Sequence, residues 1–264
     1  MQYGAMNFPV KRVRQEIKQF AALGFDFLEL TLDPPGAHYS TVRAEGDAIL
    51  RELKFCDMGL VCHLPTFVYT ADLTESIRQA SLEEMIGSLE TARALSAKKV
   101  VLHPGYIGGM GAFVMDVSRD YALQSLDAIS QKADALDVEL CLENKIPRYL
   151  TFVEPEDFKP VFEKFPKLKL TLDTGHANIG DTRGDRVIRF LKAFSHRLGH
   201  VHMSDNHGKR DDHLPVGKGN VPVEQIVQTL KAIGYDNTIT LEVVSEDRND
   251  LVISREKLNE LFLK

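Results

Sequence analysis

The chain has 264 residues, of which 44% are hydrophobic, and it carries 32 Lys and Arg against 38 Asp and Glu, a formal net charge of −6. This composition excludes a disordered chain and a coiled coil, and the length suits two ordinary domains or one α/β barrel. No apolar stretch approaches the roughly 20 residues that span a bilayer, and the N-terminus lacks the apolar core of a signal peptide. We therefore expect a soluble, cytoplasmic protein with no membrane partner.

Eight short aliphatic runs alternate with longer amphipathic stretches along the whole chain. The amphipathic stretches place apolar residues three and four apart, as at Val13, Ile17 and Phe20, and therefore predict helices. In chain order, the aliphatic runs predict strands over 2–8, 26–32, 60–64, 99–104, 138–144, 168–174, 199–204 and 238–244.

Each predicted strand is followed by a predicted helix. Near-continuous Val, Leu and Ile runs are typical of parallel strands buried on both faces, and eight βα units close a barrel. The pattern therefore predicts a single-domain (β/α)8 TIM barrel over residues 1–264. A doubly wound sheet is the alternative, but it would normally need a GxGxxG motif after a strand. The only Gly-rich segment, 108–111, opens no obvious helix, and we interpret it as a loop over the barrel mouth.

The three cysteines, Cys56, Cys62 and Cys141, form no CxxC pair and leave one odd thiol. We expect buried, reduced side chains without a chemical role. The negative net charge argues mildly against a nucleic-acid partner.

Ionisable residues stand at or near the carboxyl ends of six predicted strands. A barrel brings these ends to one face, where active sites of this fold are built. Three carboxylates crowded there should not all ionise unless protons or cations neutralise them, and neighbouring imidazoles make a metal the natural cation. His with Asp or Glu, and no thiolate, suits Zn, Mn or Fe. The six residues are His63, His103, Glu143, Asp173, His202 and Glu242.

Three further residues extend this candidate ligand set. His176 lies three residues after Asp173, and Asp211 and His213 lie two apart in a predicted loop, where their side chains point to one side. Nine candidate ligands are too many for one ion and suit a cluster of two or three. Clustered metals can hold both the attacking and the leaving oxygen of a phosphoryl displacement.

These motifs resemble those of the endonuclease IV and xylose isomerase-like superfamily of metal-dependent TIM barrels. The resemblance covers essentially the whole chain. Its most specific pieces are LEN at 142–144, LDTGH at 172–176, and the Asp211-x-His213 pair followed by Gly217-x-Gly219. The trinuclear zinc pattern of endonuclease IV maps onto all nine residues. The resemblance thus implies two to three divalent ions, with Zn preferred and Mn, Fe or Co as alternatives.

The related sugar isomerases and epimerases resemble the chain through a smaller set around one metal: Glu143, Asp173, His202 and Glu242. In those enzymes the two glutamates also move a proton between neighbouring carbons. They usually carry an Arg where this chain has the Asp-x-His pair, which counts against a simple isomerase. Endonuclease IV, in turn, uses long, polar recognition loops, whereas residues 33–39 here are short and nearly uncharged. DNA is therefore disfavoured as a substrate.

Several other residues have two interpretations. His207, Lys209, Arg210 and Lys218 are candidates for substrate binding, although a solvated loop is the simpler reading for the basic ones. His38 and His196 are expected at the surface or in the scaffold, and His200 is expected to face the helices. Glu29 could line the mouth or form a structural ion pair, and Asn144 is a candidate for orienting a ligand.

Two enzymatic hypotheses follow. The first is metal-dependent hydrolysis of a phosphoester, either a small sugar phosphate or an abasic site in DNA, with Glu143 bridging two ions. The second is isomerisation or epimerisation of a sugar or sugar phosphate, with Glu143 and Glu242 as catalytic acid and base. The number of candidate ligands favours the first hypothesis. The lack of a polar surface suited to DNA favours the second. A non-enzymatic module that stores metal or binds sugar is a third, less favoured reading.

Overall fold

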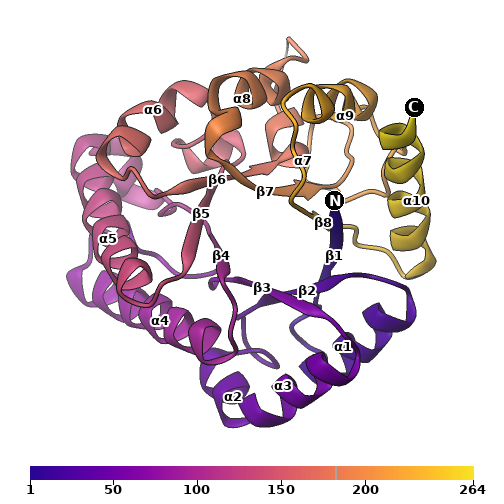
Figure 1. The fold of residues 1–264 in the computed structure, drawn as a ribbon. Helices are drawn as coiled ribbons and strands as arrows, with labels where there is room; N and C mark the ends of the chain where they lie inside the picture. Colours follow the sequence, from indigo (N-terminus) through magenta and orange to yellow (C-terminus); the bar gives the residue numbers. More distant parts are fainter. Residues whose placement is uncertain (182) are drawn as a thin grey trace.

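The computed structural model describes residues 1–181 and 183–264. Eight parallel strands form a closed barrel in chain order, with β1 paired to both β2 and β8 (Figure 1). This confirms the predicted TIM barrel and excludes the doubly wound sheet. The strands are β1 (Gln2–Met6), β2 (Phe27–Thr31), β3 (Gly59–His63), β4 (Lys99–Leu102), β5 (Glu139–Glu143), β6 (Lys169–Asp173), β7 (Leu198–Met203) and β8 (Thr238–Leu241).

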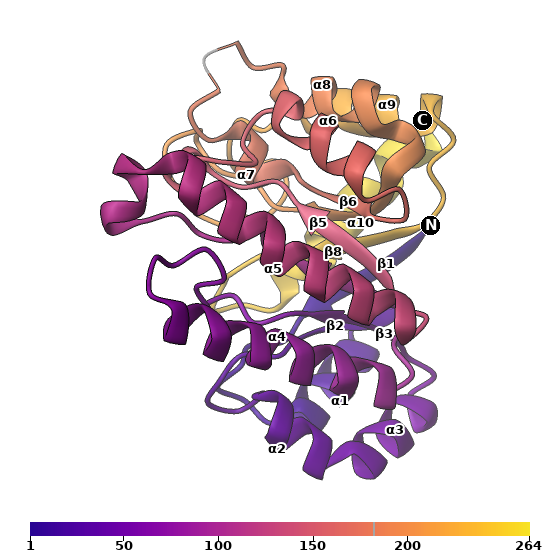
Figure 2. The same cartoon turned by 90° about the vertical axis from the view of Figure 1, so that its left-hand side faces the viewer.

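Helices surround the barrel and cover its outer surface (Figures 1 and 2). In α1, the predicted apolar positions Val13, Ile17 and Phe20 are buried. Such stripes join the outward-facing strand residues in one large core. The helices are α1 (Val13–Ala22), α2 (Tyr39–Ala44), α3 (Gly46–Phe55), α4 (Glu75–Ala94), α5 (Met115–Ala135), α6 (Pro155–Lys164), α7 (Thr174–Asn178), α8 (Arg186–Phe194), α9 (Val223–Ala232) and α10 (Asn249–Leu263).

The barrel interior changes from apolar to polar along its axis. Phe27, Val61 and Val101 form a small separate cluster. A Cβ on Gly4, which pairs with Phe27 across β1 and β2, would collide with the phenyl ring, so only glycine leaves room for this plug. One step further along β2, Glu29 is fully buried. Polar residues occupy the remaining distance to the carboxyl ends of the strands.

The expectation for His200 is wrong. Successive residues on a strand alternate between faces, so residues two apart share one, and His200 faces the interior together with His202. The register between β6 and β7 shifts at Leu170 and Thr171, where Thr171 pairs with His200. The Gly-rich segment 108–111 runs into a 3-10 turn, Gly109–Phe113. Among the residues that the structure describes, no helix is long and apolar enough to cross a membrane.

Candidate metal centre

Barrel closure gathers the six strand-end candidates at one rim. β5 and β6 are clamped together there by Asn144, whose side chain accepts a hydrogen bond from Asp173 N at 2.8 Å and donates one to Asp173 O at 2.9 Å. Asn144 thus holds the backbone of Asp173, and its role in orienting a metal ligand stays a prediction. The six are His63 at the end of β3, His103 after β4, Glu143 at the end of β5, Asp173 at the end of β6, His202 in β7 and Glu242 after β8.

The short helix α7 carries His176 into the same rim. Asp173 caps this helix, because its Oδ1 accepts from His176 N at 2.7 Å. The imidazole of His176 then lies with Nδ1 2.9 Å from Glu143 Oε1 and 3.2 Å from Asp173 Oδ2. The LDTGH motif therefore combines a strand end and a helix start, and both of its ionisable residues face the centre.

Asp211 and His213 reach the centre on a loop that is tied to the barrel by Asp205. The buried Asp205 carboxylate accepts hydrogen bonds from the backbone N–H groups of Asn206, Gly217 and Val221. Gly217 has a φ of +84°, a conformation that side chains rarely adopt. Asp205 N and O also pair with Leu214, which fixes the segment that contains both candidate ligands.

Glu143 lies at the middle of the cluster. Its Oε2 is 3.3 Å from His63 Nε2, 3.0 Å from His103 Nε2 and 3.6 Å from His202 Nδ1. On the other side of the rim, Glu242 Oε1 is 3.1 Å from the same His202 Nδ1. The side chain of Glu143 is 1% exposed, so water contributes almost nothing to its solvation.

Asp211 completes the connection. Its Oδ2 lies 3.1 Å from His176 Nε2 and 3.2 Å from His213 Nε2. All nine candidate ligands therefore belong to one continuous network at the barrel mouth, although their roles as ligands stay a prediction.

Four of the histidines share an arrangement that suits a metal ion. His63, His176 and His213 each turn Nδ1 toward a backbone carbonyl, at 2.7, 3.0 and 2.9 Å. A carbonyl only accepts hydrogen bonds, so Nδ1 carries the proton of the neutral ring and Nε2 carries the lone pair. That lone pair faces a carboxylate oxygen in all three cases, which places two acceptors opposite each other. A cation between them resolves this conflict.

His202 has the same arrangement with the two ring nitrogens exchanged. Its Nε2 lies 3.0 Å from Glu29 Oε1, and its buried Nδ1 has no hydrogen-bond partner within the described part of the chain. Asp173 Oδ2 is similarly without one. Glu143 joins two groups whose ligand atoms lie close enough for one ion each: His63, His103 and Glu143, and Glu143, Asp173 and His202. The donor set of imidazoles and carboxylates fits a divalent metal such as Zn.

The pKa values describe the centre when protons take the place of metal. Burial raises the pKa of Asp173 to about 7, with the charges of Glu242 and Glu143 acting in the same direction against His176. Burial opposes charge on His202, yet Glu242 and Glu29 raise its pKa to about 10. His213 is likewise opposed by burial, but its hydrogen bond to Asp211 helps to raise its pKa to about 9. The His202 and His213 rings keep their protons because the neighbouring carboxylates stabilise a positive charge on them.

Sequence reasoning missed Lys145, which lies inside the centre. Its side chain is 3% exposed, and Nζ lies 3.0 Å from Glu143 Oε1 and 2.9 Å from His103 Nε2. Burial lowers the pKa of His103 to about 3, and the Lys145 ammonium acts in the same direction. His103 is therefore neutral and accepts from the ammonium. Lys145 follows Glu143 by two residues, and this spacing was the available signal.

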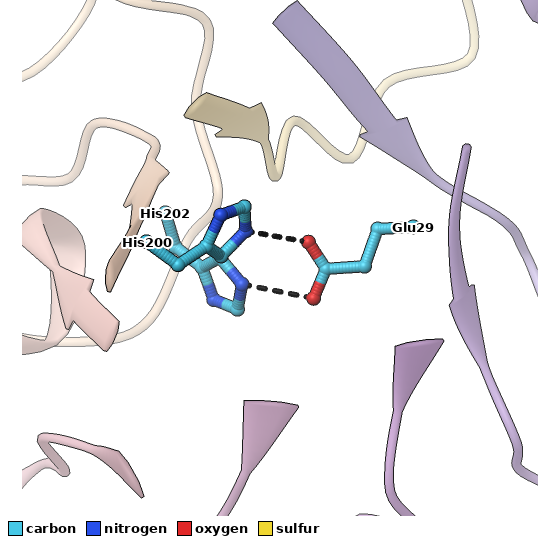
Figure 3. Close-up of side chains that lie close together, drawn as sticks. All are labelled: Glu29, His200 and His202. Atoms are coloured by element: carbon cyan, nitrogen blue, oxygen red, sulfur yellow. Dashed lines mark hydrogen bonds and ion pairs between the residues drawn. The ribbon is translucent and has the colours of Figure 1, made fainter. Parts of the chain in front are cut away.

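Glu29 proves to be an interior ion-pair residue. Its two oxygens bind His200 Nε2 at 2.9 Å and His202 Nε2 at 3.0 Å (Figure 3). Burial by itself would raise the pKa of Glu29, but the charges of the two histidines and their hydrogen bonds hold it well below its usual range. Of the two roles open to Glu29, the structure favours the ion pair.

The four predicted substrate-binding residues are not part of this network. His207, Lys209, Arg210 and Lys218 are exposed on the loop between β7 and α9. Arg210 approaches Asp212 at 3.5 Å with its side chain 85% exposed. Their contact with a substrate stays a prediction. His38 and His196 lie outside the centre, where His38 caps α2 and His196 is exposed.

Comparison with known proteins assigns the chain to a family. The family described as xylose isomerase-like TIM barrel matches residues 17–261. The chain belongs to this family. The protein is accordingly an enzyme of the xylose isomerase-like superfamily, as its motifs indicated.

Individual relatives include an uncharacterised protein of Methanocaldococcus jannaschii, which is 32% identical over 76% of this chain and 77% of that protein, as well as epimerases and a probable endonuclease. The chain is 27% identical to D-psicose 3-epimerase of Ruminiclostridium cellulolyticum, over 86% of this chain and 76% of that protein. It is 25% identical to a probable endonuclease 4 of Mycobacterium leprae, over 89% of this chain and 91% of that protein. Among solved structures, a D-tagatose 3-epimerase-like protein superposes with a TM-score of 0.86 and 26% identity, and the match covers 100% of this chain and 97% of that one.

Proposed function

We propose that the protein is a divalent-metal-dependent epimerase or isomerase of a sugar or sugar phosphate, the second of the two hypotheses. One observation carries the proposal. Glu143 and Glu242 project from β5 and β8, and both carboxylates face the same nitrogen, His202 Nδ1, at 3.6 and 3.1 Å. Two carboxylates that come from the ends of different strands and converge on one point suit proton removal by one and proton return by the other. The similarity to epimerases supports the same reading.

The four residues that would hold the metal in this reaction are Glu143, Asp173, His202 and Glu242. A divalent ion bound there would fix two neighbouring oxygens of the sugar and stabilise the negative charge that forms next to the carbonyl. Asp173 forms the N-cap of α7, and His202 is held by its hydrogen bond to Glu29, so both side chains are in place before a metal ion binds. Preorganised ligands of this kind reduce the reorganisation that the reaction requires.

The two glutamates would divide the proton transfer. One takes the proton from the carbon beside the carbonyl, and the other delivers a proton to the opposite face of that carbon, so substrate and product are isomers. Lys145 would donate a hydrogen bond from its ammonium to a sugar or phosphate oxygen near Glu143, because Nζ lies within 3.0 Å of Oε1. The ammonium also favours the ionised form of Glu143 as the base.

Phosphoester hydrolysis is the second candidate, and a specific observation favours it. Asp211 Oδ2 lies 3.1 Å from His176 Nε2 and 3.2 Å from His213 Nε2, and an ion held by these three residues would be one that a one-metal epimerase does not need. The similarity to a probable endonuclease 4 also covers most of both chains. A small phosphoester fits this reading better than DNA. In the segment after β2, Asp33 is buried and accepts hydrogen bonds from Thr66 N and Oγ1, so it serves the scaffold.

The test combines metal analysis with deuterium exchange. Protein purified without added metal is analysed for bound ions, loaded with Zn, Mn or Co, and incubated in D2O with ketoses and their phosphates. Epimerisation incorporates deuterium at the carbon beside the carbonyl and yields a second sugar, both of which are visible by NMR. Glu143→Gln should abolish both signals. Absence of exchange, together with release of phosphate from esters, would replace the proposal by hydrolysis.

A further inference from the structure

Glu29 is not one of the nine candidate ligands predicted from the sequence, yet it contacts one of them, His202, directly. It comes from β2, which supplies no candidate ligand, and it is fully buried in the barrel interior. Figure 3 shows its two carboxylate oxygens aimed separately at His200 and His202. Oε1 lies 3.0 Å from His202 Nε2, and Oε2 lies 2.9 Å from His200 Nε2.

We propose that Glu29 is the positioning residue that makes Nδ1 of His202 the metal-binding nitrogen. The carboxylate accepts a hydrogen bond from the Nε2–H group of His202, so the ring keeps its proton on Nε2 and its lone pair on Nδ1. Nδ1 faces Glu242, Glu143 and Asp173 at 3.1, 3.6 and 4.0 Å. The inference rests on the metal centre of the proposed function. A carboxylate behind a metal-binding imidazole fixes its tautomer and makes it a stronger ligand.

This arrangement distinguishes His202 from the other histidines of the centre. His63, His176 and His213 are anchored by backbone carbonyls, which no substitution removes. The anchor of His202 is a charged side chain. The orientation of His202 therefore depends on a residue that can be replaced without changing any of the nine candidate ligands. Glu29, in β2, would determine how strongly His202 binds the metal.

Glu29 is itself held in place from below. Its Oε2 is contacted by Thr240 Oγ1 as well as by His200. His200 Nδ1 lies 2.6 Å from Thr238 Oγ1, which accepts a hydrogen bond from Lys99 Nζ at 2.8 Å. A chain of hydrogen bonds thus runs from Lys99 to His202 through the barrel. Its interior members are fully or nearly fully buried, so the Glu29 carboxylate has a single place to lie.

Glu29, His200 and His202 also lie close enough to hold an ion themselves. The hydrogen bonds argue against this reading. Both nitrogens of His200 already have partners, and each histidine has its own carboxylate oxygen. No lone pair of His200 is left for a metal, so the group is better understood as a support for the centre above it.

The experiment compares Zn²⁺ binding of metal-free wild type, Glu29→Gln and Thr171→Val by isothermal titration calorimetry. Thr171→Val is the matched control, because Thr171 is fully buried and pairs with His200, but its hydroxyl has no hydrogen-bond partner within the described part of the chain and takes no part in holding Glu29. Glu29→Gln should weaken Zn²⁺ binding about 10- to 100-fold without changing the number of ions bound, and the control should stay within about threefold. Equal affinities of Glu29→Gln and wild type would overturn the proposal. Loss of one bound ion in Glu29→Gln would instead favour a metal site at Glu29.

A second measurement needs no variant. In Zn²⁺-loaded wild type with ¹⁵N-labelled histidine, the ring of His202 should carry its proton on Nε2, with Nδ1 bound to metal. A proton on Nδ1, or a wild type that binds no Zn²⁺, would refute the positioning role. Both measurements use no substrate. A protein that binds Zn²⁺ as expected but moves no sugar proton would therefore disprove the proposed function and leave the role of Glu29 intact.

Discussion

His213 donates a hydrogen bond from Nδ1 to the backbone oxygen of Glu242 at 2.9 Å. The loop that carries Asp211 and His213 is thereby joined to the end of β8, where the proposed acid or base stands. A second link, from Val244 N to His213 O at 3.0 Å, strengthens the connection. Displacement of this loop should therefore change the position of Glu242.

Asp205 is the residue that holds this loop, and its replacement should release it. Asp205→Asn places an amide group against three backbone donors, so at least one hydrogen bond to a charged acceptor is lost. We expect the free energy of unfolding in urea to fall by about 1–3 kcal/mol. Asp212→Asn is the control, because Asp212 contacts only the exposed Arg210 among its described ion pairs. Equal stability of the two variants would show that the loop is held by other contacts.

Asp211→Asn separates the two candidate reactions. The proposed epimerase uses Glu143, Asp173, His202 and Glu242, so loss of the Asp211 carboxylate should leave kcat within about tenfold of wild type. A hydrolase that depends on the outer cation position would lose the ion between His176 and His213 and most of its activity, as single catalytic groups typically contribute about 10²–10⁴-fold. Steady-state kinetics and the number of bound ions, measured on the same preparation, decide between these outcomes.

The metal-free protein should lose stability as the pH rises. The pKa values of His202 and His213, about 10 and about 9, lie above the value of about 6.5 for an unfolded histidine. The folded state thus binds more protons, and this contribution is complete below pH 6.5 and disappears as the pH rises through 9 and 10. Asp173, with a pKa of about 7, contributes in the same direction from pH 4 to 7.

We therefore expect the melting temperature without metal to fall by roughly 5 °C or more between pH 6.5 and 9.5. Zn²⁺ takes the place of the protons, and its binding strengthens as they leave, so the loaded protein should lose this dependence. Scanning calorimetry of both forms in matched buffers measures the effect. A metal-free protein whose melting temperature rises over this range would contradict the protonated centre.

Lys145→Met tests the ammonium beside Glu143. The side chain keeps its length but loses a buried donor, and we expect KM for a sugar phosphate or sugar to rise about tenfold or more. Lys218→Met is the matched control from the exposed loop, where a basic residue was also considered for substrate binding. A rise in KM for Lys218→Met alone would move the substrate contact from the strand end to that loop.

The sequence predicted the barrel well because each buried strand is a short aliphatic run. The predicted ranges and the observed strands differ at most by a few residues at their ends, as at 238–244 against Thr238–Leu241. Six of the nine rim residues were found from sequence because they stand at or near the ends of such runs, and barrel closure gathers them. The other three came from the LDTGH and Asp-x-His motifs, and they reach the rim through α7 and the loop held by Asp205.

Residues that depend on side-chain geometry were harder to predict. His200 was assigned to the wrong face by a counting error on the strand, and correct alternation would have placed it beside His202. Lys145 was overlooked because a lysine after a strand usually lies in solvent. The charge that keeps it buried belongs to Glu143, and only the structure brings Nζ to that carboxylate.

The phenyl ring of Phe27, together with Val61 and Val101, closes the barrel below Glu29. Ions, substrate and product would therefore reach the centre from the carboxyl ends of the strands, the end at which the loop held by Asp205 lies. Exchange of a tightly held ion should accordingly be slow while a sugar is bound at the centre, because the bound sugar would block the route by which the ion leaves.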